Sequence, residues 1–159
     1  MEENITLPNL LIVGAAKSGT TSLHNYLKQH PDIFMTEHKE PHFLINSEIG
    51  ERRVHNAVIK LEEYQKMFKT KNNYKYKGES SVMYLAFPEF SIPNIKKYLT
   101  SDVKIIIMLR NPIERAFAGY LHNLRYNSSE NLTFKEAIVS SEDRYYANKE
   151  MTPDTRYLH

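Results

Sequence analysis

The segment 14–22 reads GAAKSGTTS, and its glycines, lysine and hydroxyl residues stand in an order that suits an anion-binding loop. It follows the apolar run 10–13 and precedes a stretch that favours a helix, so the backbone N–H groups at the helix start would point at the anion. The lysine adds a full positive charge, and side-chain hydroxyls could donate to further oxygens. An ordinary glycine-rich turn would leave the same pattern. The candidate phosphate-binding residues are Lys17, Ser18, Gly19, Thr20, Thr21 and Ser22.

This loop differs from the nucleoside triphosphate motif G-x-x-x-x-G-K-[ST], because Lys17 precedes Gly19 rather than following it. A triphosphate site also needs an acidic residue on a neighbouring strand to organise Mg²⁺. The apolar run 103–109 is instead followed by Arg110, a second cation that would bind an anion and repel a metal ion. The two cationic sites suggest a ligand with two separated phosphate groups and no metal requirement.

The elements that must position these residues alternate between strands and helices. Helical spacing and start signals predict helices, and apolar, β-rich runs predict strands. Such alternation is typical of an α/β fold with a mainly parallel sheet. The predicted strands are 10–13, 33–35, 75–79 and 103–109, and the predicted helices are 20–29, 51–68, 92–99 (opened by Ser91 and Pro93), 112–126 and 133–145 (opened by a Thr133/Glu136 capping box).

Length and composition exclude several classes of protein. The chain has 159 residues, 41% hydrophobic and 25% charged, which predicts one globular domain rather than a disordered tail, a collagen-like rod or a coiled coil. The net charge of +2 gives no general attraction to nucleic acid or anionic membrane. The absence of cysteine excludes disulfides, thiolate metal sites and cysteine nucleophiles. The acidic start and short apolar runs favour a cytoplasmic protein without a membrane span.

Four short blocks occur in order along the chain: KSGTT at 17–21, KEPHF at 39–43, GESS at 78–81 and LRNPIERA at 109–116. Together they resemble the sulfotransferase family over about residues 9–158. The second block is closer to the glycosaminoglycan and bacterial branch than to the small-phenol branch. The resemblance implies a P-loop-like, three-layer α/β fold with a mainly parallel sheet flanked by helices. It also implies metal-independent transfer of a sulfuryl group from 3′-phosphoadenosine 5′-phosphosulfate (PAPS) to an acceptor hydroxyl or amine.

The resemblance assigns roles to individual residues. Residues 17–22 would hold the 5′-phosphosulfate, with Lys17 beside the leaving oxygen, and Arg110 would hold the 3′-phosphate. Glu40 matches the catalytic carboxylate of the glycosaminoglycan branch and would accept the acceptor's proton, provided that partial burial raises its pKa toward the working pH. His42 is an alternative base, an orienting group or a packing residue. Without the resemblance, Glu40 would be taken for an exposed carboxylate in a charged stretch.

Two departures from the family pattern bear on the site. The family places a serine eight residues after the position of Arg110, where this chain has Ala118. The family also continues past the position of His159 with a further nucleotide-closing loop, so we expect the chain to be the amino-terminal two thirds of one domain. Ser80 and Ser81 could shape the acceptor side or bond to the catalytic carboxylate. A nucleotide kinase and a non-catalytic nucleotide-binding protein stay open as alternatives, and the acceptor could be a carbohydrate or a small molecule.

Overall fold

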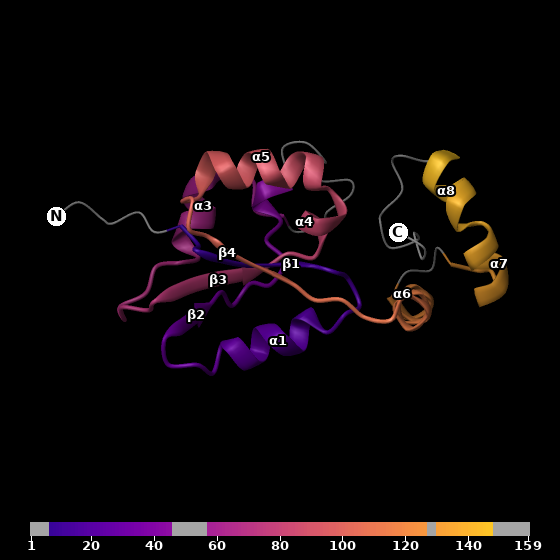
Figure 1. Cartoon of the computed structure of the whole chain (residues 1–159), viewed down its shortest axis with the longest axis horizontal. Helices are drawn as coiled ribbons and strands as arrows, with labels where there is room; N and C mark the ends of the chain where they lie inside the picture. Colours follow the sequence, from indigo (N-terminus) through magenta and orange to yellow (C-terminus); the bar gives the residue numbers. More distant parts are fainter. Residues whose placement is uncertain (1–6, 46–56, 127–129, 148–159) are drawn as a thin grey trace.

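The computed structural model describes residues 7–45, 57–126 and 130–147, and within these ranges it has one parallel sheet with helices on both faces (Figure 1). The strand order is β2-β3-β1-β4, and each neighbouring pair is parallel. The predicted three-layer α/β fold is therefore confirmed. The strands are β1 (Leu10–Gly14), β2 (Ile33–Met35), β3 (Tyr76–Ser80) and β4 (Lys104–Ile107).

The helices form the two outer layers and a separate group beyond the sheet. Helix α1 covers one face, α3, α4 and α5 lie over the other, and α6, α7 and α8 follow β4 and lie beyond one end of the sheet (Figure 1). No helix in the described ranges is long and apolar enough to cross a membrane. The bounds are α1 (Thr20–Leu27), α3 (Leu61–Lys66), α4 (Met83–Ala86), α5 (Pro88–Tyr98), α6 (Pro112–Tyr126), α7 (Phe134–Val139) and α8 (Ser141–Ala147).

Strand β1 is the centre of the hydrophobic core, because both of its faces are covered. Leu11 and Val13 pack into a cluster with residues of α3, α4 and α5, whereas Leu10 and Ile12 pack toward α1. All four side chains are buried. A strand buried on both faces has no need of polar alternation, which explains the continuous apolar run that predicted it.

Three predicted helices differ from the observed ones in their bounds. Helix α5 begins at Pro88 rather than near Ser91, because proline fits the first helical position, where no N–H is needed. Pro93 therefore lies inside the helix, and the prediction that it opens the helix was wrong. The Thr133 capping box is confirmed, but the helix it opens ends before Ser140, and α8 follows.

The predicted helix 51–68 is shorter in the structure. Residues 51–56 lie outside the described ranges, and of the remainder the structure shows α3, whose first residue is Leu61. Lys60 has an extended backbone, with φ −94° and ψ 136°, so the helix cannot extend back through it. Tyr64 and Phe68, two of the apolar positions that predicted this helix, are fully buried.

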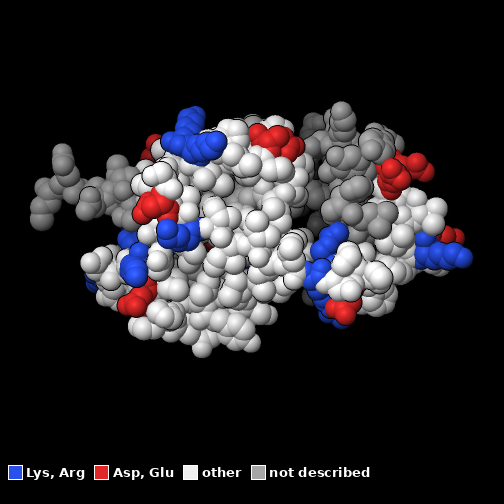
Figure 2. All heavy atoms as spheres, viewed as in Figure 1, with Lys and Arg blue, Asp and Glu red and all other residues white. Residues whose placement is uncertain are grey.

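Strand β4 is an edge strand of the described sheet, and it is exposed in spite of its apolar sequence. Ile107 is 51% exposed and Leu109, just beyond the strand, is 80% exposed. Helix α6 also exposes large apolar side chains, among them Ile113 and Phe117. On the face seen in Figure 2, lysine and arginine side chains lie interspersed with acidic ones rather than in one basic patch.

Candidate active site

The four sequence blocks meet at one edge of the sheet, which we call the carboxyl edge because all four parallel strands end there. The phosphate loop (residues 14–22) follows β1, residues 36–43 follow β2, Ser80 ends β3, and Arg110 follows β4. The chain leaves the neighbours β1 and β3 toward opposite faces, into α1 and α4 (Figure 1). Parallel α/β sheets bind ligands at such a switch point, so the topology predicts a site between the phosphate loop and Ser80.

Two glycines shape the phosphate loop. Gly14 has φ 146°, and a side chain there would place its Cβ 2.8 Å from Cβ of Leu85. Gly19, directly before α1, has φ 92°. Both conformations are open to glycine and rarely to other residues. The loop is also fixed to the segment after β4, since Ala15 N–H donates to the Met108 carbonyl (2.9 Å) and Met108 N–H donates to the Gly14 carbonyl (2.8 Å).

The phosphate loop presents donors that suit an anionic group. Helix α1 has neither a side-chain cap nor an acidic residue in its first turn, so its first N–H groups face outward without an intrahelical partner. The Oγ of Ser18 is buried and makes no hydrogen bond to any residue that the structure describes. Thr20 is buried at the helix start, whereas Thr21 and Ser22 are exposed. A phosphate oxygen at this place would satisfy both the hydroxyl and the helix amides.

The second predicted cation lies against the same loop. Arg110 Nη1 donates to the Lys17 carbonyl at 3.5 Å, and its Nε pairs with Glu114 Oε2 at 3.1 Å. The structure thus brings Arg110 and the phosphate loop together, with the first turn of α6 orienting the guanidinium. Ala118 lies one helical turn after Glu114 on α6 and is half-buried. Its predicted place beside the 3′-phosphate stays a prediction.

The three predicted catalytic residues share a backbone feature that the sequence did not reveal. Lys17, Glu40 and His42 have φ values of 62°, 63° and 51°, in the left-handed region. Such conformations cost non-glycine residues on the order of 1–3 kcal/mol each and cluster at functional sites. The strained backbone of these three residues therefore favours a functional role over simple packing.

The side chains of Glu40 and His42 lie against each other at the carboxyl edge. His42 Nε2 lies 3.4 Å from Glu40 Oε2, and Lys39 Nζ donates to the other carboxylate oxygen. Burial raises the pKa of Glu40, but the hydrogen bonds and charges of His42 and Lys39 outweigh it and lower the pKa to about 2. The condition that burial brings this pKa toward the working pH was therefore wrong. Glu40 is a carboxylate at neutral pH, ready to accept a proton but weakly basic.

The lowered pKa of Glu40 predicts a specific dependence of stability on pH. Since the pKa of Glu40 is depressed from 4.5 to about 2 on folding, its stabilisation is complete above the unfolded value and is lost as the pH falls through the folded one. We expect Glu40→Gln to flatten the decline in the free energy of unfolding between about pH 5 and pH 2. Urea denaturation at several pH values measures this, and equal slopes in both proteins would contradict the lowered pKa of Glu40.

His24 is a site residue that the sequence reasoning missed. Its Nε2 donates to the Thr36 carbonyl at 3.1 Å, and its Nδ1 lies 2.8 Å from Ser80 Oγ. Burial lowers the pKa of His24, which favours the neutral ring, with Nδ1 accepting from the serine hydroxyl. The ring thereby ties α1 to the ends of β2 and β3. The sequence offered one signal for this role: His24 lies four residues after Thr20, which places both side chains on the same face of the helix.

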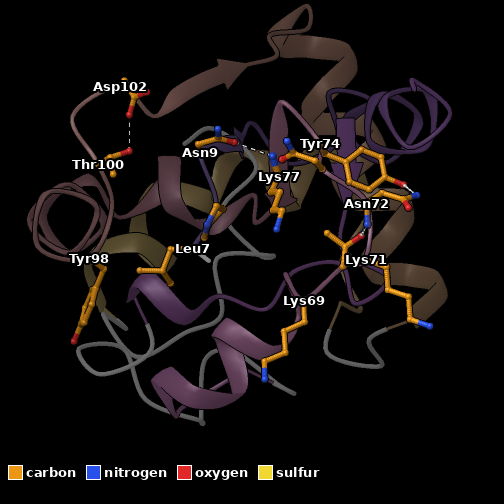
Figure 3. Close-up of a pocket in the computed structure, with 13 residues that line it drawn as sticks. Leu7, Asn9, Lys69, Lys71, Asn72, Tyr74, Lys77, Tyr98, Thr100 and Asp102 are labelled. Atoms are coloured by element: carbon orange, nitrogen blue, oxygen red, sulfur yellow. Dashed lines mark hydrogen bonds between the residues drawn. The ribbon is translucent and has the colours of Figure 1, made fainter. Parts of the chain in front are cut away.

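A cavity of about 910 Å³ lies away from these residues (Figure 3). Its lining includes Asn9, directly before β1, and Asp102, shortly before β4, so it opens at the opposite edge of the sheet. Lys69, Lys71 and Lys77 also line it. None of the predicted site residues contributes to this cavity, and the candidate active site is the carboxyl edge.

Comparison with known proteins agrees with this geometry. A sulfotransferase domain model matches residues 7–151. The human bifunctional heparan sulfate N-deacetylase/N-sulfotransferase 1 is 30% identical over 140 residues, which are 86% of this chain and 15% of that protein. The membrane-associated sulfotransferase kil1 of Dictyostelium discoideum is 30% identical over 122 residues (77% and 24%). Carbohydrate sulfotransferase 15 of Mus musculus is 27% identical over 171 residues (85% and 30%).

A solved structure shows the same arrangement of elements. The crystal structure of a sulfotransferase from Alicyclobacillus acidocaldarius superposes with a TM-score of 0.85 at 35% sequence identity, covering 96% of this chain and 63% of that one. The chain thus spans less than a third of the curated relatives named above and about two thirds of the bacterial protein. Because the domain model matches residues 7–151 of the chain and the fold is shared with a solved sulfotransferase, this chain belongs to the sulfotransferase family.

Proposed function

We propose that the chain transfers a sulfuryl group from PAPS to a hydroxyl or amine of an acceptor. The observation that carries the proposal is that the phosphate loop and Arg110 lie together at the carboxyl edge. The phosphate loop offers a buried hydroxyl on Ser18 without a partner among the described residues, and Arg110 lies against the same loop. In the proposal, the phosphate loop with Lys17 takes the 5′-phosphosulfate of the donor and Arg110 takes its 3′-phosphate, and family membership supplies the reaction class.

In the proposed reaction, the acceptor oxygen or nitrogen attacks the sulfur in line with the leaving group. A bond forms between the acceptor and sulfur, the bond from sulfur to the 5′-phosphate oxygen breaks, and adenosine 3′,5′-bisphosphate departs. Lys17 neutralises the charge that develops on the departing oxygen, since a positioned cation acts most strongly where charge appears in the transition state. The acceptor's proton passes to the Glu40 carboxylate, which is already ionised.

His42 stays the alternative base. Its Nε2 faces the Glu40 carboxylate, and its buried Nδ1 makes no hydrogen bond to the described residues. Histidine is also the side chain that most often serves as a general base in enzymes. In our proposal His42 orients Glu40 and shares the proton, and the paired variants in the Discussion distinguish the two assignments.

For the acceptor, we propose a carbohydrate. The support is that the chain's relatives include a carbohydrate sulfotransferase and a heparan sulfate N-sulfotransferase. A small-molecule acceptor is the second candidate. Transfer assays with labelled donor and unsulfated polysaccharides, followed by small alcohols and phenols, separate the two.

The donor class can be tested before any acceptor is known. A ligand that binds the folded state at 100 times its dissociation constant stabilises it by about 2.7 kcal/mol. We expect adenosine 3′,5′-bisphosphate to raise the melting temperature more than ATP with Mg²⁺ at equal concentration. Stabilisation by magnesium ATP alone would favour a nucleotide kinase instead. Stabilisation by the bisphosphate without any transfer would favour the non-catalytic binding protein.

A pair of variants tests the 3′-phosphate site. We expect Arg110→Ala to weaken adenosine 3′,5′-bisphosphate binding by more than about tenfold, because a hydrogen bond to a charged group contributes about 1.5–3 kcal/mol. Ala118→Ser restores the family's hydroxyl and should tighten binding by about tenfold. Titration calorimetry measures both. An unchanged affinity in Arg110→Ala would remove the 3′-phosphate from this position.

A further inference from the structure

Glu79 is a buried carboxylate directly before the last residue of β3, and its side chain is held by hydroxyl groups. The residue has no solvent exposure. Tyr64 and Tyr84 donate to its Oε1 at 3.1 and 2.6 Å, and Ser81 donates to its Oε2 at 2.8 Å. Burial raises the pKa of Glu79, and the hydrogen bonds from Tyr84 and Ser81 oppose that rise. A buried carboxylate is costly unless it serves as an acceptor in such a network.

Two of these hydroxyls continue the network to the segment that carries the candidate base. We call residues 40–44 the base segment. The backbone N–H of His42 donates to Ser81 Oγ at 3.1 Å, and that of Leu44 donates to the Tyr84 hydroxyl at 3.3 Å. Because each hydroxyl has one hydrogen and already accepts an N–H, it orients that hydrogen toward Glu79. Two continuous chains therefore run from the backbone of the base segment to one carboxylate.

The base segment needs such an anchor. Glu40 and His42 both have left-handed backbone conformations, which persist only where the surroundings determine them. The Glu40 N–H donates to the Ser80 carbonyl at 2.9 Å, and the two chains through Glu79 hold the backbone at His42 and Leu44. The carboxylate thus joins β3 to the segment that must present Glu40 and His42.

We propose that Glu79 is a positioning residue, which holds the base segment and with it the Glu40–His42 pair at the carboxyl edge. This inference rests on the proposed function, in which Glu40 and His42 handle the acceptor's proton. Glu79 itself is buried and acts through Ser81 and Tyr84. Glu79 keeps the strained backbone of Glu40 and His42 in a fixed position relative to the phosphate loop.

The test is Glu79→Gln, which keeps the shape and changes one acceptor into a donor. Whichever way the amide turns, its NH₂ faces a hydroxyl that already receives a backbone N–H. That hydroxyl can accept both groups, but its own hydrogen then has no acceptor on the glutamine, so at least one chain is weakened. We expect the His42 or Leu44 amide to exchange with solvent at least about tenfold faster. We also expect kcat for transfer to fall about tenfold, while the KM for the donor changes by less than about twofold.

Three further variants supply controls. Ser81→Ala should accelerate exchange at His42, and Tyr84→Phe should accelerate it at Leu44, because each removes one chain. Tyr64→Phe removes the Tyr64 hydroxyl, which donates to Glu79 and for which the structure gives no bond to the base segment. The ring is kept, and with it the stacking on Phe43 at 4.4 Å between ring centroids. It should leave both amides protected. These variants decide the matter if Glu79→Gln does not fold.

Hydrogen exchange read by NMR separates the possible outcomes. The reference is the Leu23 amide, which donates at 3.1 Å to the carbonyl of Gly19, the residue directly before α1. Faster exchange at His42 or Leu44 with an unchanged Leu23 supports the positioning role. Unchanged exchange in Glu79→Gln, Ser81→Ala and Tyr84→Phe overturns it. An equal loss of protection at the His42, Leu44 and Leu23 amides overturns it as well. Exchange does not depend on transfer, so a wild-type chain without transfer would contradict the proposed function and not this inference.

Discussion

Replacing Lys17 by alanine is expected to lower the rate of sulfuryl transfer by about 10²–10³-fold, the usual cost of removing one group that stabilises developing charge. The same change should alter the free energy of unfolding by less than about 1 kcal/mol. Lys17 has φ 62°, and alanine is no more strained there than lysine, because both carry a Cβ. Initial rates with PAPS and thermal melts measure the two effects.

A matched control for Lys17 lies on the same side of the sheet. Lys28, directly after α1, pairs with Glu37 at 2.6 Å and is remote from the phosphate loop along the helix. Lys28→Ala removes the same charge from the chain and should leave transfer unchanged. Equal losses in Lys28→Ala and Lys17→Ala would mean that general charge, rather than a contact with the leaving group, is responsible. Full activity in Lys17→Ala would end the assignment.

Glu40→Gln is expected to reduce transfer by about 10²–10⁴-fold, because the amide keeps the shape of the side chain but cannot accept the acceptor's proton. The affinity for adenosine 3′,5′-bisphosphate should change by less than about twofold, since Glu40 follows β2 and the phosphate loop follows β1. Single-turnover rates and calorimetry give both numbers. Glu37→Gln, at an exposed carboxylate three residues earlier, is the matched control and should transfer at the wild-type rate.

His42→Ala distinguishes the two candidate bases. In our account it disturbs the orientation of Glu40, which its Nε2 contacts at 3.4 Å, and it lowers transfer less than Glu40→Gln does. Abolished transfer in His42→Ala together with near-normal transfer in Glu40→Gln would identify His42 as the base. The carboxylate would then be the orienting group, which its low pKa would also suit.

The elements whose signals are local were predictable from the sequence. The apolar run of β1 shows a strand buried on both faces, and the Thr133/Glu136 capping box marks the start of α7. Pro93 misled the prediction, because proline favours a helix start but is also tolerated inside a helix at the cost of one hydrogen bond. The exposure of β4 could not be read from its sequence, since burial depends on what packs against a strand.

For the site, the sequence predicted which residues follow strands, and the parallel sheet brought them to one edge. It could not predict how they interact there. The low pKa of Glu40 depends on Lys39 and His42 in a particular backbone conformation. Glu79, which lies between a glycine and two serines in the sequence, gives no sign of the hydroxyl network that surrounds it. Such roles depend on three-dimensional contacts between residues far apart in the chain.

The most direct test of the central claim is a crystal structure of the chain with adenosine 3′,5′-bisphosphate. We expect the 5′-phosphate to lie against the start of α1, within hydrogen-bond distance of Ser18 Oγ, and the 3′-phosphate to contact the Arg110 guanidinium. Glu40 should face the open side of the 5′-phosphate, where the sulfuryl group would stand. A nucleotide bound instead in the cavity of Figure 3, or one whose phosphates contact neither the phosphate loop nor Arg110, would contradict the account.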